Sequence, residues 1–266
     1  MFDTAFLQLT QEKLIIGILV LARISGIFTA GHFYGNLAIP IPVKIMLILI
    51  ITMILAPTCF ADAPHIDFNI LNMFFLLFKE FLIGAILGFA TNIVYWAARF
   101  GGGITDMDMG YQASLMFDQE AGAPTLVGEF YALSAMMIFL YMQGHHFVIE
   151  TLVLSIKAVP LTTFLMTEST LKMLFLIVSS FMMLGLKMAA PVLITLFNMN
   201  LALTMLARVA PQMNIFMLSF QVKIAVGLLI LFVSVPIIGV VSKQALNVME
   251  VEITKLLLTF NPALAN

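Results

Sequence analysis

Two groups of side chains in this 266-residue sequence have types and spacings that suggest chemistry. Asp106 and Asp108 stand two apart in a glycine-rich stretch, and His145 and His146 precede Glu150. An aspartyl protease needs two carboxylates that share a proton, and such a pair usually comes from two separate elements. Zinc proteases carry two histidines four residues apart with an adjacent glutamate, and that spacing is absent. We therefore expect no catalytic residue, no metal and no cofactor.

The composition places the chain in a different class. It is 62% apolar and 10% charged, with a mean hydropathy of +1.10. Soluble domains are about 45–50% apolar and about 25% charged, so this sequence indicates a polytopic membrane protein. Cys59 is the only cysteine, which excludes a disulfide within the chain. A net charge of −2 gives no basic excess, and nucleic acid is not an expected partner.

Apolar runs at residues 14–30, 43–56 and 70–98 predict the first membrane helices. Arg23 lies well inside the first run, where it faces protein or water, or extends to the membrane interface. The third run is longer than the roughly 20 residues that a span needs. Within it, Gly84 and Gly88 follow Glu80 at four-residue spacing and give one helix face two small residues. This spacing suits close packing of a second helix, with a hinge as the alternative.

The second half of the chain predicts interrupted helices. Apolar runs at residues 130–142 and 147–159 form one broken helix or two half-spans. The run at residues 171–206 contains Pro191, which predicts a single kinked helix. A run at residues 215–241 precedes an amphipathic tail. Charges lie inside most of the long runs, and we expect other proteins or water to surround them: Arg23, Lys79, Glu80, Glu150, Lys187 and Lys223.

Residues 99–128 separate these halves and are rich in Gly, Met and Asp. Irregular backbone at membrane depth is tolerated only where protein buries it or where it lines a water-filled cavity. The expected organisation is an N-terminal helical part (1–98), this loop (99–128), a C-terminal helical part (129–241) and a tail (242–266). Flexible methionines could plug a channel, and an ordinary loop is the alternative. An ion-coupled transporter is a further alternative, although no internal repeat is evident. If this loop is a plug, as the family resemblance described below implies, its expected plug or gate residues are Gly101, Gly102, Gly103, Met107, Met109, Gly110, Met116, Phe117 and Asp118.

Several motifs resemble those of the FliR-type family of type III export proteins. Residues 207–216, ARVAPQMNIF, are similar to the family pattern Arg-x-x-Pro-Gln-x-Asn-x-Phe, and residues 80–89 fit Glu-x-x-x-Gly-x-x-x-Gly-Phe. The resemblance runs in order over residues 14–241. Gln119 and residues 219–221 depart from the family pattern. The motif residues are Arg23, Glu80, Gly84, Gly88, Gly144, His145, Pro191, Arg208, Pro211, Gln212, Asn214 and Phe216.

The resemblance implies an all-α, polytopic membrane protein built of helical hairpins, with kinked and broken helices. Such a subunit joins FliP-like and FliQ-like subunits in the flagellar export gate of the inner membrane, at the basal body. FlhB-like and FlhA-like components and membrane lipid are its neighbours, and unfolded flagellar proteins are its cargo. The loop at residues 99–128 would plug the channel, with glycine hinges at both ends and Asp106, Asp108 and Asp118 keeping it hydrated. The equivalent virulence secretion subunit is the alternative.

Overall fold

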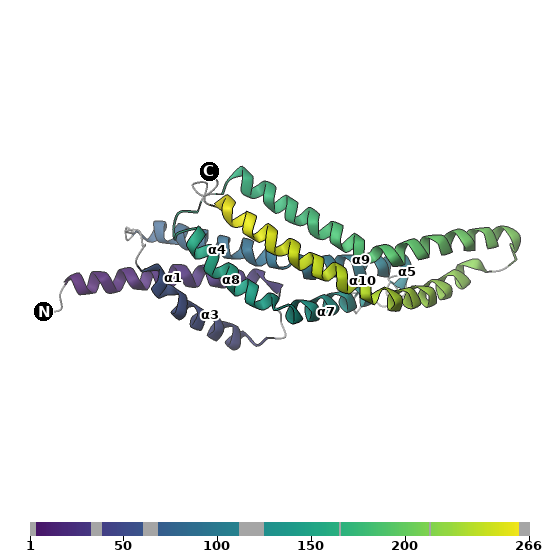
Figure 1. The fold of residues 1–266 in the computed structure, drawn as a ribbon, viewed down its shortest axis with the longest axis horizontal. Coiled ribbons are helices and arrows are strands. Elements are labelled where there is room, and N and C mark those ends of the chain that lie inside the picture. The colour runs from purple at the N-terminus through teal and green to yellow at the C-terminus, as the bar shows by residue number, and fades with distance from the viewer. Residues whose placement is uncertain are drawn as a thin grey trace. The chain divides into compact units, whose positions relative to one another are not determined.

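A computed structural model describes residues 4–32, 39–60, 69–111, 125–164, 166–212 and 214–260. For residues 4–11, 215 and 216 only the backbone is considered. Every regular element in these ranges is helical, as the sequence predicts. In chain order they are α1 (Thr4–Ala30), α3 (Ile41–Leu55), η1 (Ala56–Cys59), α4 (Ile70–Thr91), α5 (Ile93–Met109), α7 (Leu126–Tyr141), α8 (Gly144–Ala158), α9 (Glu168–Val209) and α10 (Ile215–Phe260) (Figure 1).

Particular residues determine where the helices begin and end. Pro40 precedes α3, whose first turn contains Pro42, and the side chain of Asn69 accepts a hydrogen bond from the Leu71 N–H at the start of α4. The long run at 70–98 is divided at Asn92, where α4 ends and α5 follows. Gln143 separates α7 from α8 and adopts a left-handed conformation with φ of 60°. The break expected between residues 142 and 147 is therefore confirmed.

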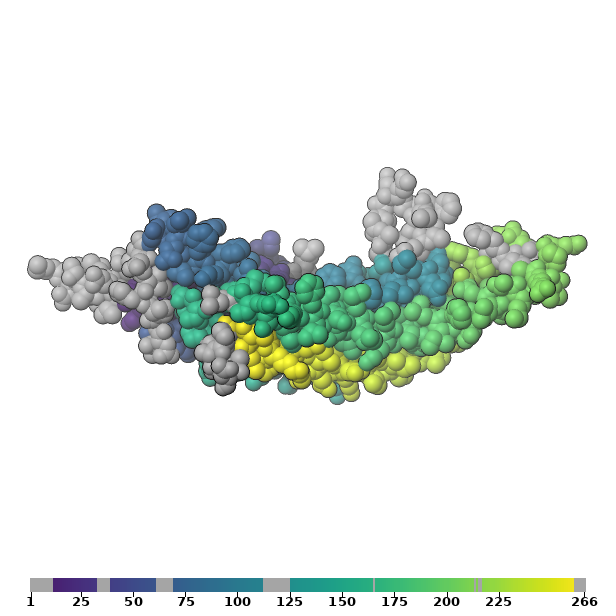
Figure 2. All heavy atoms as spheres, turned by 90° about the horizontal axis from the view of Figure 1, so that it is seen from above, coloured from purple at the N-terminus to yellow at the C-terminus, as the bar shows by residue number. Residues whose placement is uncertain are grey.

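The chain folds into two compact units. The first comprises Met1–Asn92, Gln143–Ile177 and Met249–Asn266, and the second comprises Ile93–Met142 and Val178–Val248. In the first unit α1 lies along α4, and their buried residues include Leu19, Ile24 and Ile83 (Figure 1). The remaining face of α4 is open, as the blue surface in Figure 2 shows, and it carries five exposed phenylalanines together with Ile70 and Leu71. Such a face suits lipid or other subunits rather than water.

The apolar helices confirm an all-α polytopic membrane protein. Within the described residues, five helices are long and apolar enough to cross a membrane, and the pair α7 and α8 adds a sixth if it forms one broken span. Helix α9 has 42 residues and continues through Pro191, and α10 has 46 residues and continues through Ser242 to Phe260. At 1.5 Å per residue each extends over roughly 60 Å, about twice the hydrocarbon core. Each helix is therefore longer than a perpendicular span of the membrane requires.

Candidate functional site

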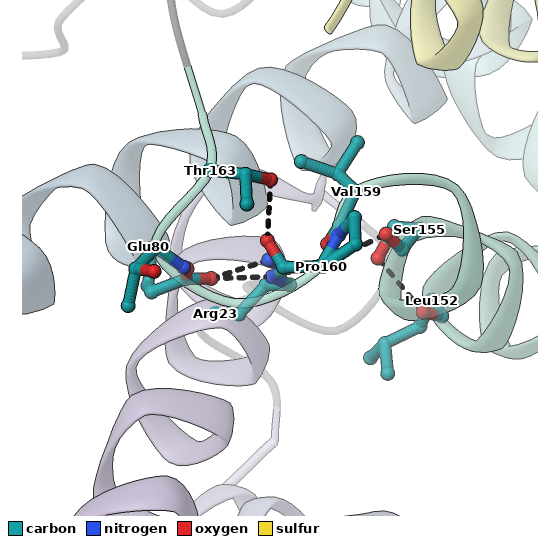
Figure 3. Close-up of polar contacts among 8 residues, drawn as sticks. Arg23, Glu80, Leu152, Ser155, Val159, Pro160 and Thr163 are labelled. Atoms are coloured by element: carbon teal, nitrogen blue, oxygen red, sulfur yellow. Dashed lines mark hydrogen bonds and ion pairs between the residues drawn. The ribbon is translucent and has the colours of Figure 1, made fainter. Parts of the chain in front are cut away.

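The most buried charges of the first unit form an ion pair between α1 and α4 (Figure 3). The Nε and Nη2 atoms of Arg23 each lie 2.6 Å from Oε2 of Glu80, and both side chains are completely buried. Arg23 thus faces protein, which is one of the two alternatives that the sequence left open. Other charges in the apolar runs differ, because Glu150 and Lys187 are exposed. Arg23 and Glu80 are 57 residues apart, and no sequence pattern indicated that they are partners.

Glycines bring the two backbones close enough for this pair to form. A Cβ atom on Gly84 would lie 2.0 Å from the carbonyl oxygen of Arg23, and one on Gly88 would lie 2.8 Å from that of Ile27. Gly26 makes the reciprocal contact, because its Cβ would lie 2.3 Å from the Phe81 carbonyl oxygen. The close packing predicted from Gly84 and Gly88 is confirmed, and α1 is the helix they contact.

The ion pair also holds the segment that follows α8. Nη1 of Arg23 donates to the carbonyl oxygens of Ser155 and Val159, at 2.9 and 3.0 Å (Figure 3). The last carbonyls of a helix lack partners within the helix, and a cation there also complements the helix dipole. On the other side, Oε1 of Glu80 accepts from the N–H of Thr162 at 2.9 Å, where the backbone has φ of 75°. Both charges are therefore hydrogen-bonded to backbone groups beyond their own ion pair.

Asn92 makes a second link in the first unit that the sequence did not suggest. Its Nδ2 donates to the Ala30 carbonyl oxygen at 2.6 Å, and its Oδ1 accepts from the His32 N–H. The residue directly after α4 thus satisfies backbone groups at the end of α1. The long apolar run also contains Asn72, so the presence of an asparagine there did not by itself indicate this role.

In the second unit, both ends of the expected loop at residues 99–128 are helical in the part of the chain that the structure describes. Helix α5 continues to Met109 and α7 begins at Leu126, so Gly101–Gly103 are helical rather than part of a loop. A Cβ on Gly101 would lie 2.4 Å from the Gly185 carbonyl oxygen, and one on Gly102 would lie 2.5 Å from Cα of Gly128. These two glycines permit close helix packing. Gly110, with φ of 76°, is the glycine whose backbone conformation disfavours other residues.

Asp106 differs from the hydrating role expected for it. It is completely buried, and its carboxylate accepts hydrogen bonds from the N–H groups of Val127 and Gly128, at 3.1 to 3.3 Å. It thereby caps the N-terminus of α7 from the neighbouring helix. Burial raises the pKa of Asp106, and the two N–H donors act in the opposite direction. Arg99 of α5 also pairs with Glu129 of α7 at 2.9 Å.

The proposed plug methionines have different surroundings. Met107 is 65% exposed, whereas Met109 is 1% exposed. The side chain of Met109 packs against Gly227 of α10, and a Cβ atom at Gly227 would clash with it. Met109 is therefore a core residue of the second unit. Met116, Phe117 and Asp118 lie outside the described residues.

The remaining motif residues lie at helix ends and within α9. Arg208 occupies the last turn of α9, and Pro211 and Gln212 in the following turn are exposed. Asn214 accepts a hydrogen bond from the Met217 N–H at 3.4 Å, at the start of α10. Gly144 is buried at the first position of α8, His145 follows it, and Pro191 lies inside α9. The side chain of Phe216 lies outside the described residues.

These features define a class of protein: an all-α, multi-pass membrane protein in which buried side chains tie helix ends together. Comparison with known proteins gives the family. The chain belongs to the family described as bacterial export proteins, family 1, which it matches over residues 14–249. This confirms the resemblance that the motifs carry.

The named relatives include flagellar biosynthetic proteins and a surface presentation of antigens protein. The chain is 28% identical to the flagellar biosynthetic protein FliR of Bacillus subtilis (strain 168), over 86% of this chain and 90% of the relative. It is 30% identical to FliR of Pectobacterium carotovorum subsp. carotovorum, over 81% and 82%. It is 29% identical to the surface presentation of antigens protein SpaR of Shigella sonnei, over 80% and 82%.

Proposed function

We propose that this chain is a core subunit of a flagellar type III export gate in the bacterial inner membrane. It assembles with FliP-like and FliQ-like subunits into a gated channel, next to FlhB-like and FlhA-like components, and unfolded flagellar proteins pass through. The family match over residues 14–249 carries this proposal. The similarity to SpaR favours the corresponding virulence subunit as the second candidate. In either system the chain contributes structure and makes or breaks no bond.

The structure supports an assembled rather than a solitary state. Apolar side chains are exposed along both long helices, including Phe197 of α9 and Phe232 of α10, at 61% and 80%. Because these helices are longer than a bilayer is thick, exposed apolar residues outside the lipid need protein partners. Arg208 at the end of α9 and Gln212 in the turn that follows are exposed and available to such partners.

Co-expression with FliP-like and FliQ-like subunits tests the proposal. We expect the three chains to co-purify, and Arg208→Ala to reduce the recovered complex roughly tenfold, as loss of an interface arginine does. Expression of the chain itself should stay unchanged, because Arg208 is exposed. Lys187→Ala, an exposed cation on the same helix, is the matched control. Equal losses of complex and of expressed chain would argue against the interface role, and a chain that transports ions alone would favour a transporter.

We further propose that the connection between α5 and α7 closes the resting channel. Met107, exposed at the end of α5, begins this plug, and Met116, Phe117 and Asp118 continue it along the chain. Gly110 is its hinge at the α5 end, a position where the backbone is left-handed. Apolar side chains in a constriction can exclude water and ions.

Deleting residues 112–120 should make the assembled gate leak ions in reconstituted vesicles. The deletion leaves Asp106 in place because that residue caps α7. Its removal would destabilise the fold, and a leak caused by misfolding would then be indistinguishable from a leak caused by loss of the plug. Ion flux through vesicles that contain the wild-type or the deleted gate is the measurement. A deleted gate that assembles and stays as tight as wild type would disprove the plug.

A further inference from the structure

A cavity of about 400 Å³ lies in the first unit, between the end of α3 with η1 and the end of α8. Its buried wall consists of Leu55, Cys59 and Leu161, and Val153 and Ile156 of α8 are half-buried beside them. Thr58 and Lys157 line it with exposed side chains. The cavity therefore combines an apolar interior with a polar rim that carries a positive charge, and none of its described lining residues is acidic.

The position of the cavity along the helices indicates its depth in the membrane. The candidate span formed by α3 and η1 ends at Cys59, which lines the cavity, and the candidate span of α1 begins at Glu12. Lys13 lies next to that end as well, with its Nζ 5.7 Å from the centre of the Phe60 ring. Two lysines thus accompany the end of one membrane span. This is the level at which lipid head groups meet the first methylene groups of their chains.

We propose that this cavity binds one anionic phospholipid of the surrounding bilayer. An acyl chain enters the apolar interior, and the head-group phosphate lies against Lys157. Lys157 is suited to this role because it forms no ion pair within the part of the chain that the structure describes. Burial of methylene groups supplies most of the binding free energy, and the lysine selects a negatively charged head group.

The cavity wall includes the segment that the ion pair holds. Pro160 and Leu161 line the cavity, and they lie between Val159 and Thr162, whose backbone groups bind Arg23 and Glu80. A bound lipid would therefore rest against a wall fixed by that pair. This inference depends on the chain being in a membrane and not on its participation in export, so failure of either proposal leaves the other intact.

Cys59 offers a direct probe because it is the only cysteine and lines the cavity. The purified full-length chain is reconstituted in phosphatidylcholine vesicles with or without phosphatidylglycerol, and the rate of Cys59 alkylation by a maleimide is measured. We expect phosphatidylglycerol to slow alkylation of the wild type about fivefold, the effect of one lysine near an anionic lipid. Lys157→Gln should abolish this difference. Lys172→Gln, an exposed lysine that pairs with Glu168 on α9, should retain it.

Two further measurements keep the proposal testable if a variant folds poorly. Native mass spectrometry of the wild type should show one retained phosphatidylglycerol, and fewer for Lys157→Gln. Leu161→Trp, which fills the cavity, should make alkylation slow in both lipids. Equal alkylation rates of the wild type in the two lipids, or equal behaviour of the two lysine variants, would overturn the proposal. Protection of Cys59 only by an added partner subunit would overturn it too.

Discussion

Arg23→Ala should destabilise the chain by about 3–5 kcal/mol, the cost of breaking a buried ion pair by removing one partner. The Glu80 carboxylate would stay buried without its cation, and the carbonyl oxygens of Ser155 and Val159 would lose the hydrogen bonds from Arg23. Both losses act on the same place, the segment after α8. Thermal unfolding of the chain in detergent, followed by circular dichroism, measures the change.

Two further variants distinguish the effect of losing the ion pair from the effect of losing side-chain volume. Arg23→Met combined with Glu80→Met removes both charges, so the double variant should be more stable than the sum of its single variants predicts. Lys79→Ala, next to Glu80 on α4 but only half-buried, should change unfolding little. Additive effects of the two methionine substitutions would show that the charges act independently. A loss of unfolding free energy below about 1 kcal/mol for Arg23→Ala would show that the pair contributes no more to stability than a surface salt bridge does.

Gly84→Ala should be nearly as damaging, although it adds only a methyl group. The new Cβ would lie 2.0 Å from the Arg23 carbonyl oxygen and 2.9 Å from its carbonyl carbon, which are backbone atoms. A flexible side chain could rotate away from this contact, whereas a helix backbone must move as a whole. We expect a loss of about 1–3 kcal/mol or more, as found for overpacked cores, and lower melting in the same detergent assay.

Gly17→Ala provides the matched control on α1. Apart from the backbone of its own helix and its chain neighbours, no heavy atom among the described residues lies within 4 Å of the position its Cβ would take. Alanine is favoured over glycine inside a helix by up to about 1 kcal/mol, so this variant should be neutral or slightly stabilising. If Gly17→Ala and Gly84→Ala shift the melting temperature equally, close backbone packing does not explain the effect.

The sequence predicted the parts of the fold that depend on local pattern. Long apolar runs identified membrane helices, and the spacing of Gly84 and Gly88 correctly predicted close helix packing. These predictions succeeded because each depends on residues only a few positions apart. For Arg23 the sequence left two alternatives open, contact with protein or water and extension to the membrane interface, and the structure shows contact with protein.

The predictions that failed concern contacts between distant residues. Gly101 and Gly102 suggested a loop by composition, but their partners are Gly185 and Gly128 on other helices. The partner of Arg23 and the cap that Asp106 provides for α7 were not predicted for the same reason, because each contact joins residues that are far apart in the sequence. Glycine in a membrane helix has two common uses, flexibility and close approach, and a single sequence does not distinguish them.

The contacts between α5 and α7 fix the positions of these two helices independently of the length of the connection between them. Asp106 and Arg99 bind the first turns of α7, and Gly102 lies against Gly128, so the two helix ends are fixed to each other directly. The connection between them therefore joins two helix ends that are already held together by other residues. Doubling the length of such a loop costs only about 0.6 kcal/mol of closure entropy. We therefore expect that an epitope inserted into this connection leaves α5 and α7 in place.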